Sequence, residues 1–142
     1  MKTVQQILNV KPLQVFSVTE GSSVLEALHL MMEKNISALL IVEGQKLLGI
    51  FTERDYARKI ILHGKSSADT PVKEVMTADP ITIKPTDSID LCMEIMTEKH
   101  IRHLPVANEG QLLGMVSIGD VVKFIIADQK LTISQLESYI SS

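Results

Sequence analysis

Hydrophobic and polar residues follow one another in an order that occurs twice along the chain. In each half, a short apolar stretch predicts a strand, and the next stretch carries apolar residues three or four positions apart, which predicts a helix. Two further apolar stretches, joined by polar residues and a glycine, have the spacing of a β-hairpin, and a second helical stretch follows them. The predicted strands span residues 16–18, 38–42 and 47–52, then 81–83, 104–107 and 112–117, and the second helices run from about 53 to 62 and from about 118 to 127. The pattern therefore predicts an α+β fold of two β-α-β-β-α units.

The two halves are copies of one unit, because residues 15–61 align with residues 80–126 without a gap. Identical pairs include Ser23 with Ser88, Met31 with Met96, Leu47-Leu48-Gly49 with Leu112-Leu113-Gly114, and Asp55 with Asp120. A unit this short encloses too little core by itself, so we expect both copies to pack as one pseudo-two-fold domain. We predict that residues 1–67 form the first repeat with a lead-in, residues 68–127 the second repeat, and residues 128–142 a helical tail that caps the domain or contacts another subunit.

Composition limits the classes of partner. The 142 residues include 45% hydrophobic and 22% charged residues and carry a net charge of −3, which is typical of a globular domain and disfavours nucleic acid or an anionic membrane as a partner. The single cysteine, Cys92, excludes an internal disulfide and a cysteine-based zinc site. The chain has no apolar run of membrane-spanning length and no signal-peptide core near its start. We therefore expect a cytoplasmic protein.

The segments GIFTERD (Gly49–Asp55) and GMVSIGD (Gly114–Asp120) carry the most informative chemistry. Each ends an apolar strand with a hydroxyl, Thr52 or Ser117, and places an aspartate three residues later in the first turn of a helix. Amide groups at a helix start can bind a phosphate, and a carboxylate one turn further can accept hydrogen bonds from ribose hydroxyls. The same spacing is also that of a capping box, which is purely structural. Both interpretations stay open on the residues alone, although recurrence in both copies favours a ligand.

The two copies differ in their charged residues. Arg54 in the first copy stands where the second has Gly119, and Arg102 and His103 precede a strand where the first copy has Ser37 and Ala38. Arginine can hold a phosphate through several N–H donors, but an exposed arginine can equally serve solubility. The residues favour no catalytic chemistry: the histidines lack metal-ligand spacing, and neither a Walker loop nor a nucleophile elbow occurs. We expect no enzyme, no catalytic residue and no metal.

The chain resembles a tandem pair of CBS domains, the module named after cystathionine β-synthase, also called a Bateman module. The strings NISALLIV and HIRHLPVA, the leads PVKEVM and DPITI, and the endings GIFTERD and GMVSIGD carry this resemblance from about Thr3 to Ala127. It looks most similar to stand-alone bacterial CBS-pair proteins. The resemblance implies a disc-like homodimer and two clefts that bind adenosine-containing ligands such as AMP, ADP, ATP, NADH or S-adenosylmethionine.

The resemblance also implies which residues line each cleft. The terminal aspartate would hold ribose, and the hydroxyl three residues earlier would meet phosphate. One cleft would use Thr52, Arg54 and Asp55 with Ile81, Thr82, Ile101 and Arg102. The other would use Ser117 and Asp120 with Phe16, Ser17, Ile36, Ser37 and Ala38, and with Arg102 and His103 near its phosphate.

The function that follows is a regulatory sensor. It would bind an adenine nucleotide as ligand, with no catalytic cofactor, and signal to a separate protein effector by changing shape. The alternative is a structural or partner-docking module without a small-molecule ligand, in which the aspartates only cap helices. A hydrolase acting on adenine nucleotides is a third hypothesis, which requires turnover.

Overall fold

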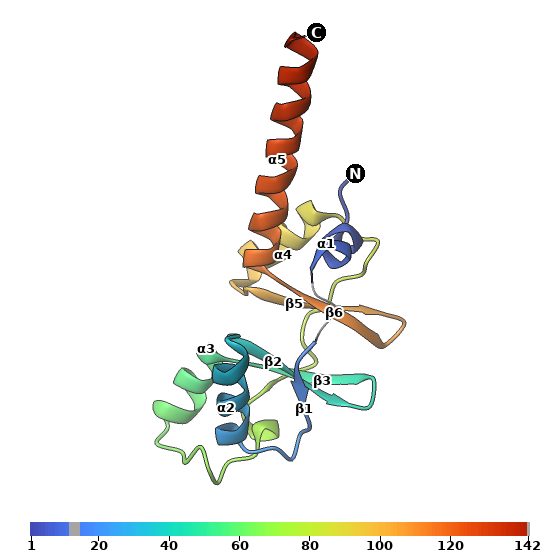
Figure 1. Ribbon diagram of the computed structural model, residues 1–142. Helices are drawn as coiled ribbons and strands as arrows, with labels where there is room; N and C mark the ends of the chain where they lie inside the picture. Colours follow the sequence, from blue (N-terminus) through green and yellow to red (C-terminus); the bar gives the residue numbers. More distant parts are fainter. Residues whose placement is uncertain (12–14, 142) are drawn as a thin grey trace.

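The computed structural model of the protein describes residues 1–11 and 15–141, which form two halves of similar construction lying one above the other (Figure 1). The first half contains β1 (Ser17–Val18), α2 (Val24–Lys34), β2 (Ala38–Glu43), β3 (Lys46–Thr52), α3 (Glu53–Tyr56) and the π-helical turn η1 (Ala57–Ile61). The second contains α4 (Ile89–Lys99), β5 (His103–Asn108), β6 (Gln111–Ser117) and α5 (Ile118–Ser141). Helix α1 (Val4–Val10) precedes both halves, and the 3-10 turn η2 (Val72–Glu74) and β4 (Thr77–Ala78) connect them. The predicted α+β fold of two repeated units is confirmed.

Equivalent residues begin and end the first helix of each half. Ser23 and Ser88 cap α2 and α4, and each hydroxyl accepts a hydrogen bond of 3.0 Å from the amide three residues later. Asn35 and His100 end the same helices in the left-handed conformation, each with a φ of 54°. These local signals explain why both amphipathic stretches form helices of the same length and turn into the next strand at the same point.

The strands form one sheet in the order β1-β2-β3-β6-β5, with β4 also paired to β3. Each half contributes an antiparallel hairpin, from Ala38↔Thr52 to Glu43↔Lys46 and from His103↔Ser117 to Asn108↔Gln111. The hairpins meet at a single pair, Lys46↔Gln111. Ala38, Leu40 and Ile50 of the first half also pack against Leu112 and Met115 of the second. The predicted packing of both copies into one pseudo-symmetric domain rests on this apolar contact.

The predicted strand at residues 81–83 is wrong. Only Ile83 pairs, in an isolated parallel bridge with Val106, whereas the corresponding β1 forms a two-residue ladder with β2. In the first half the amide of Leu40 donates to Phe16 at 3.4 Å. Pro105 stands at the position of Leu40 in the second half and has no N–H group to donate, so the ladder cannot extend. Just before this segment, β4 lies against β3 at Gly49↔Ala78 and Ile50↔Thr77.

The two lead-in segments are exchanged between the halves. Val4, Ile7 and Leu8 of α1 belong to the core of the second half, with Cys92, Met96, Leu104, Val116 and Val121 among their neighbours. Val72 and Val75 belong to the core of the first half, with Val24, Leu39, Phe51 and Ile60. Figure 1 shows α1 beside α4 and α5, far from β1. Each core is therefore completed by a segment that lies before the other repeat in the sequence.

Helix α5 runs without interruption from Ile118 to Ser141. Val121 is buried, and Phe124 and Ile125 pack against the second core. Every described residue after Asp128 is exposed, and the helix extends away from the body of the protein (Figure 1). The tail expected after residue 127 is thus the continuation of α5, and it does not cap the domain.

Candidate functional site

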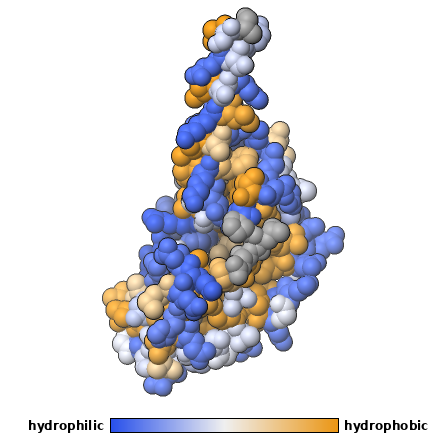
Figure 2. All heavy atoms as spheres, in the orientation of Figure 1, coloured by the Kyte–Doolittle hydropathy of each residue, from blue (hydrophilic) through white to orange (hydrophobic). Residues whose placement is uncertain are grey.

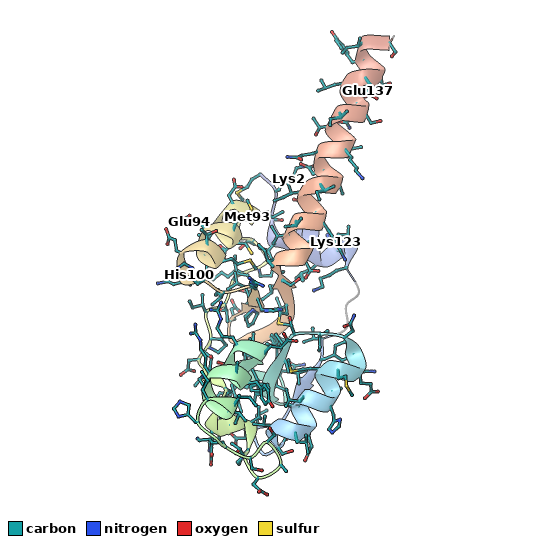
Figure 3. The ribbon with its side chains drawn as sticks, turned by 90° about the vertical axis from the view of Figure 1, so that its left-hand side faces the viewer. Lys2, Met93, Glu94, His100, Lys123 and Glu137 are labelled. Carbon is teal, nitrogen blue, oxygen red and sulfur yellow. The ribbon has the colours of Figure 1, made fainter. Side chains whose placement is uncertain are left out.

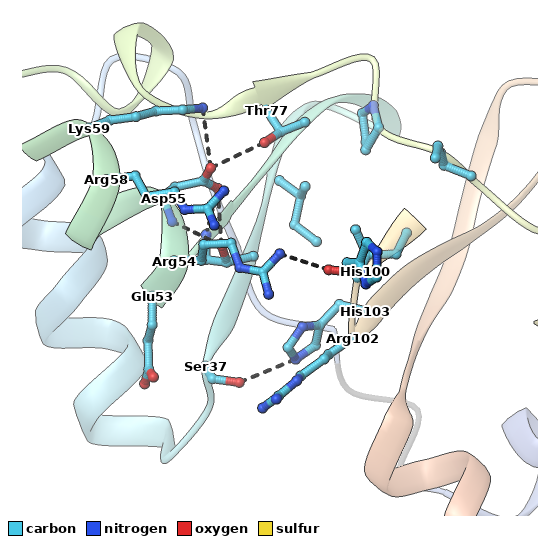
Figure 4. Close-up of a pocket in the computed structure, with 15 residues that line it drawn as sticks. Ser37, Glu53, Arg54, Asp55, Arg58, Lys59, Thr77, His100, Arg102 and His103 are labelled. Atoms are coloured by element: carbon cyan, nitrogen blue, oxygen red, sulfur yellow. Dashed lines mark hydrogen bonds and ion pairs between the residues drawn. The ribbon is translucent and has the colours of Figure 1, made fainter. Parts of the chain in front are cut away.

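A pocket of about 590 Å³ opens between the two halves (Figure 4). The end of β3 and the start of the following helix form one wall, and the connection near Thr77–Ile81 and the entrance of β5 form the other. Its lining residues are Ser37, Ile50, Thr52, Glu53, Arg54, Asp55, Arg58, Lys59, Thr77, Pro80, Ile81, His100, Ile101, Arg102 and His103. Ile50, Pro80, Ile81 and Ile101 supply an apolar surface among these polar groups. A few polar groups set into an apolar wall are typical of a small-molecule site.

Asp55 is held rigidly in this pocket. Its side chain accepts hydrogen bonds from the amide of Thr52 at 3.0 Å, from the hydroxyl of Thr52 at 3.2 Å and from the hydroxyl of Thr77 at 3.2 Å. Lys59, one helical turn later, lies 3.2 Å from Oδ1. The residue is 8% exposed. These contacts fix the carboxylate of Asp55 and connect the first helical turn of α3 to β4 across the pocket.

The charge of the pocket lining suits an anion. Arg54, Arg58, Lys59 and Arg102 are cationic, whereas Glu53 and Asp55 are the acidic residues of the lining. Arg54 reaches from α3 to the second half, where its Nη1 donates to the carbonyl of His100 at 2.7 Å. Figure 4 shows Arg54, His100, Arg102 and His103 gathered on one side of Asp55. The excess of cations is local, since the whole chain carries a net charge of −3.

His103 joins the two halves at the edge of the pocket. Its Nε2 lies 3.2 Å from the hydroxyl of Ser37, which precedes β2 in the first half. Burial lowers the pKa of His103 below its ordinary value; Asp120 opposes this shift, and Lys11 and Arg102 add to it. The imidazole is therefore neutral at pH 7, and it can gain charge when an anion enters the pocket.

The aspartate of the second repeat has a different neighbour. Asp120 accepts a hydrogen bond from the amide of Ser117 at 2.9 Å, and its own amide donates to the Ser117 hydroxyl at 3.1 Å. Lys11 lies 2.7 Å from Oδ2 of Asp120 and also donates to the carbonyl of Met115 at 2.6 Å. Burial favours the neutral acid, but hydrogen bonds from Lys11 and Ser117 outweigh it, and the pKa of Asp120 is lowered. Lys11 thus forms an ion pair with Asp120, the residue equivalent to Asp55 in the second repeat.

Comparison with known proteins agrees with this doubled architecture. The sequence model of the family described as "CBS domain" matches residues 6–62 and again residues 72–127. The chain belongs to the CBS-domain family. Its two halves are CBS repeats, and together they form the tandem CBS fold, the Bateman module, that the sequence predicted.

Individual relatives share most of the chain. The CBS domain-containing protein CBSX3, mitochondrial, of Arabidopsis thaliana is 41% identical over 127 residues, which are 86% of this chain and 62% of the plant protein. The CBS domain-containing protein YhcV of Bacillus subtilis is 33% identical over 108 residues, 76% of each chain. A solved structure of a protein with CBS domains from Burkholderia ambifaria has 50% identity and a TM-score of 0.86, covering 90% of this chain and 96% of its own. The chain thus spans less than two thirds of the plant relative but almost all of the solved one.

The CBS pair brings most residues of the first predicted cleft together. Its pocket contains Thr52, Arg54, Asp55, Ile81, Ile101 and Arg102, while Thr82 is outside the lining. Ser37 and His103, which were expected in the second cleft, line this first pocket. Thr52 and Asp55 also form a complete capping box, so the structural and the ligand interpretations apply to the same residues.

The residues expected in the second cleft of the CBS pair lie in several surroundings. Ala38 is buried in the contact between the hairpins, and Phe16 and Ile36 pack against the first core. Ser17 is exposed in β1, and Ser117 and Asp120 lie together with Lys11. The interpretation of the sequence missed Lys59 and Thr77, although the separation of Lys59 from Asp55 by one helical turn was a usable signal. Nothing local in the sequence links Lys11 to Asp120.

Two further properties of the described chain bear on the site. Within residues 1–11 and 15–141, no helix combines the length and the apolar character needed to cross a membrane. In the same residues, no three histidine, cysteine, aspartate or glutamate side chains gather as they would around a metal ion.

Proposed function

We propose that this CBS pair is a regulatory module that binds an adenine nucleotide in the pocket at Asp55 and transmits binding to a separate protein by a change of shape. One observation carries the proposal: a rigidly held carboxylate, several cationic side chains and an apolar wall from both repeats share a single pocket. This combination matches ribose hydroxyls, phosphate and adenine in turn. A sensor of this kind requires no catalytic residue, and none is assigned.

Each part of the nucleotide has a proposed contact. Asp55 accepts hydrogen bonds from the ribose hydroxyls, and Thr52, Arg54 and Arg102 contact phosphate. Ile81 and Ile101 contact the adenine ring from the second repeat. Because Arg54 already bridges to the carbonyl of His100, a phosphate that draws Arg54 away would alter the contact between the repeats. This exchange of partners is the proposed origin of the change of shape.

A structural neighbour supports this class of ligand at the level of the fold. The CBS domain protein PAE2072 of Pyrobaculum aerophilum, with 23% identity and a TM-score of 0.74, was solved in complex with AMP. We propose AMP, ADP, ATP or NADH as the ligand class, because the pocket offers contacts to the part these ligands share. The second set, Ser117 and Asp120 with Phe16, Ser17, Ile36 and Ala38, is proposed as a weaker cleft, since Lys11 lies closer to Asp120 (2.7 Å) than Lys59 lies to Asp55 (3.2 Å) and is less exposed than Lys59.

Self-association is part of the proposal. A CBS-CP12 protein from bloom-forming cyanobacteria, 25% identical, is hexameric. In this chain Ile61 of η1 and Ile118, Val122 and Ile126 of α5 expose apolar side chains on the second helices of the two repeats. We propose that these side chains join two copies into a homodimer. A cytoplasmic location remains a prediction.

Calorimetric titration with AMP, ATP and NADH tests the nucleotide proposal. The wild type should bind at least one of them at micromolar concentration. Asp55→Asn and Arg54→Ala should each weaken binding about tenfold or more, and the exposed-site variant Glu43→Gln should not. Arg54→Ala should weaken ATP binding more than adenosine binding if it contacts phosphate. If the folded protein bound none of the three nucleotides, the result would favour the partner-docking module. Formation of a product from ATP with Mg²⁺ would favour the hydrolase.

A further inference from the structure

The outer part of α5 exposes an apolar surface far from the pocket. The ion pair between Lys2 and Asp128, 3.1 Å long, marks the point at which the helix leaves the body. Beyond it, Leu131, Ile133, Leu136 and Ile140 are all more than half exposed, and Ile140 reaches 80%. Figures 2 and 3 show this part of the helix standing clear of both repeats, with orange apolar atoms along it and Glu137 on its outer half. A helical segment this short is marginally stable in water unless an apolar face is packed.

Five apolar residues and Gln129 form a row along α5 with the spacing of paired helices. Positions 122, 126, 129, 133, 136 and 140 are separated alternately by four and three residues. They carry Val122, Ile126, Gln129, Ile133, Leu136 and Ile140. The side chains that attach α5 to the body, Val121, Phe124 and Ile125, lie on another face of the helix. The row at Ile133, Leu136 and Ile140 is therefore directed at something outside this chain.

Two charged residues beside this row indicate which helix can pair with it and in which direction. Lys130 and Glu137 lie on the same edge of the row, two helical turns apart. When a second α5 runs antiparallel with its Leu136 opposite Ile133, Lys130 of each copy lies beside Glu137 of the other. A parallel pair would place Lys130 near Ile125 and Glu137 near Thr132 of the second copy, and neither charge would have an opposite one. Lys130 and Glu137 thus complement the same two residues of a second α5 that runs in the opposite direction.

We propose that residues 129–141 of α5 pair antiparallel with the same residues of a second copy of this chain. The two segments would overlap over about 20 Å at 1.5 Å per residue. Each helix would end where the other leaves its body near Asp128, so the overlap coincides with the exposed segment. The contact is two-fold and self-complementary, as expected between identical chains. It extends the self-association proposed above beyond Val122 and Ile126, which begin the same row, to residues 129–141, and it is independent of nucleotide binding.

Disulfide trapping in the full chain tests both partner and direction. In the double variant Lys130→Cys with Glu137→Cys, oxidation should yield a covalent dimer, because each new thiol faces the other one across the pair. The thiols of one helix are about 10 Å apart along its axis, beyond disulfide reach, and the native Cys92 is buried. The single variants are matched controls and should stay monomeric on a non-reducing gel. The proposal would be overturned if the single variants formed as much covalent dimer as the double variant, or if the double variant formed none. A dimer of Ile140→Cys alone would indicate a parallel pair and would overturn it as well, because antiparallel pairing keeps the two copies of position 140 about 16 Å apart along the axis.

Charge exchange gives an independent measurement. Lys130→Glu or Glu137→Lys alone should raise the dissociation constant of this contact about tenfold in sedimentation experiments, and the two together should restore it. If the double variant associates no better than the singles, the antiparallel pairing is wrong. All samples are measured without nucleotide, and AMP, ATP and NADH titrations of the same variants should match the wild type. A failure of the helix-pairing test would therefore not affect the nucleotide proposal, and a failure of nucleotide binding would not affect the helix pairing.

Discussion

The Nζ atom of Lys11 lies 2.7 Å from Oδ2 of Asp120 and 2.6 Å from the carbonyl oxygen of Met115. In the first repeat, the equivalent Asp55 receives Lys59 from its own helix and lines the open pocket. Repeat symmetry makes the two aspartates equivalent in sequence, but a lysine from the exchanged lead-in makes them different in structure. The lysine links the chain just after α1 to the first turn of α5.

Removing Lys11 should expose the second aspartate. In Lys11→Met, Asp120 loses its cation and a carboxylate becomes available for ribose hydroxyls, so the number of nucleotides bound per chain should rise. Calorimetric titration of this variant beside Lys2→Met, which loses only an exposed ion pair, measures the change. An unchanged stoichiometry in Lys11→Met would mean that Lys11 does not limit the second cleft.

The lowered pKa of Asp120 makes the contribution of this pair depend on pH. Because the pKa in the folded state lies below that in the unfolded state, the stabilisation is complete above the ordinary aspartate range and is lost as pH falls through the folded-state value. Asp120→Asn should lower the free energy of unfolding by about 1–3 kcal/mol at pH 7, and less as the pH is lowered. Urea denaturation at several pH values measures both. Asp128→Asn, whose partner Lys2 is more exposed, should cost less than about 1 kcal/mol. A loss for Asp120→Asn that did not change with pH would contradict this assignment.

His103 should titrate below the ordinary histidine value of about 6.5. Burial lowers its pKa, so the unfolded chain binds the proton more readily, and the protein should lose stability as pH falls from about 6.5 through the folded-state pKa. NMR titration of the ring protons, assigned with His103→Gln, measures the midpoint. A phosphate bound nearby should raise it, and AMP addition tests this directly. A midpoint at or above 6.5 without nucleotide would show that His103 is not desolvated.

Gly49 and Gly114 occupy equivalent positions but should tolerate alanine differently. A Cβ at Gly49 would lie 2.8 Å from the carbonyl oxygen of Thr77 in β4, and 2.6 Å from the sulfur of Met76. At Gly114 the nearest atom is a methyl carbon of Leu8 at 3.1 Å. Since backbone yields less than a side chain, Gly49→Ala should cost about 1–3 kcal/mol and Gly114→Ala less. Thermal denaturation of the two variants measures the difference. Equal losses of stability would mean that β4 moves freely.

Local sequence signals predicted the repeated units well. The hairpins followed from apolar stretches around a glycine turn, and the capping serines marked the starts of α2 and α4. The doubled Ser/Thr-x-x-Asp spacing placed Thr52 and Asp55 together at the start of α3. These features depend on contacts within a few residues or within one hairpin, so pattern and spacing are sufficient to find them.

Long-range contacts were not accessible in the same way. The pairing of β4 with β3, the pocket contact of Thr77 with Asp55 and the ion pair of Lys11 with Asp120 join segments far apart in sequence. The ladder expected at 81–83 does not form because Pro105 lacks the N–H group that Leu40 donates to Phe16 in the first half. Ser37 and His103, which were assigned to the second cleft, form a hydrogen bond across the halves and line the first pocket as well. Predicting such contacts requires knowing how the two halves pack, and the periodicity of the sequence does not contain that information.

The exchange of lead-in segments also imposes an order on folding while the ribosome makes the chain. The first core includes Val72 and Val75, so it cannot close before residue 75 has left the exit tunnel. The second core includes both Val4 and Val121, so α1 must wait for its partners until residue 121 has been made. At roughly 5–20 residues per second, that wait is on the order of ten seconds. During it, the apolar face of the nascent α1 is a natural target for chaperones.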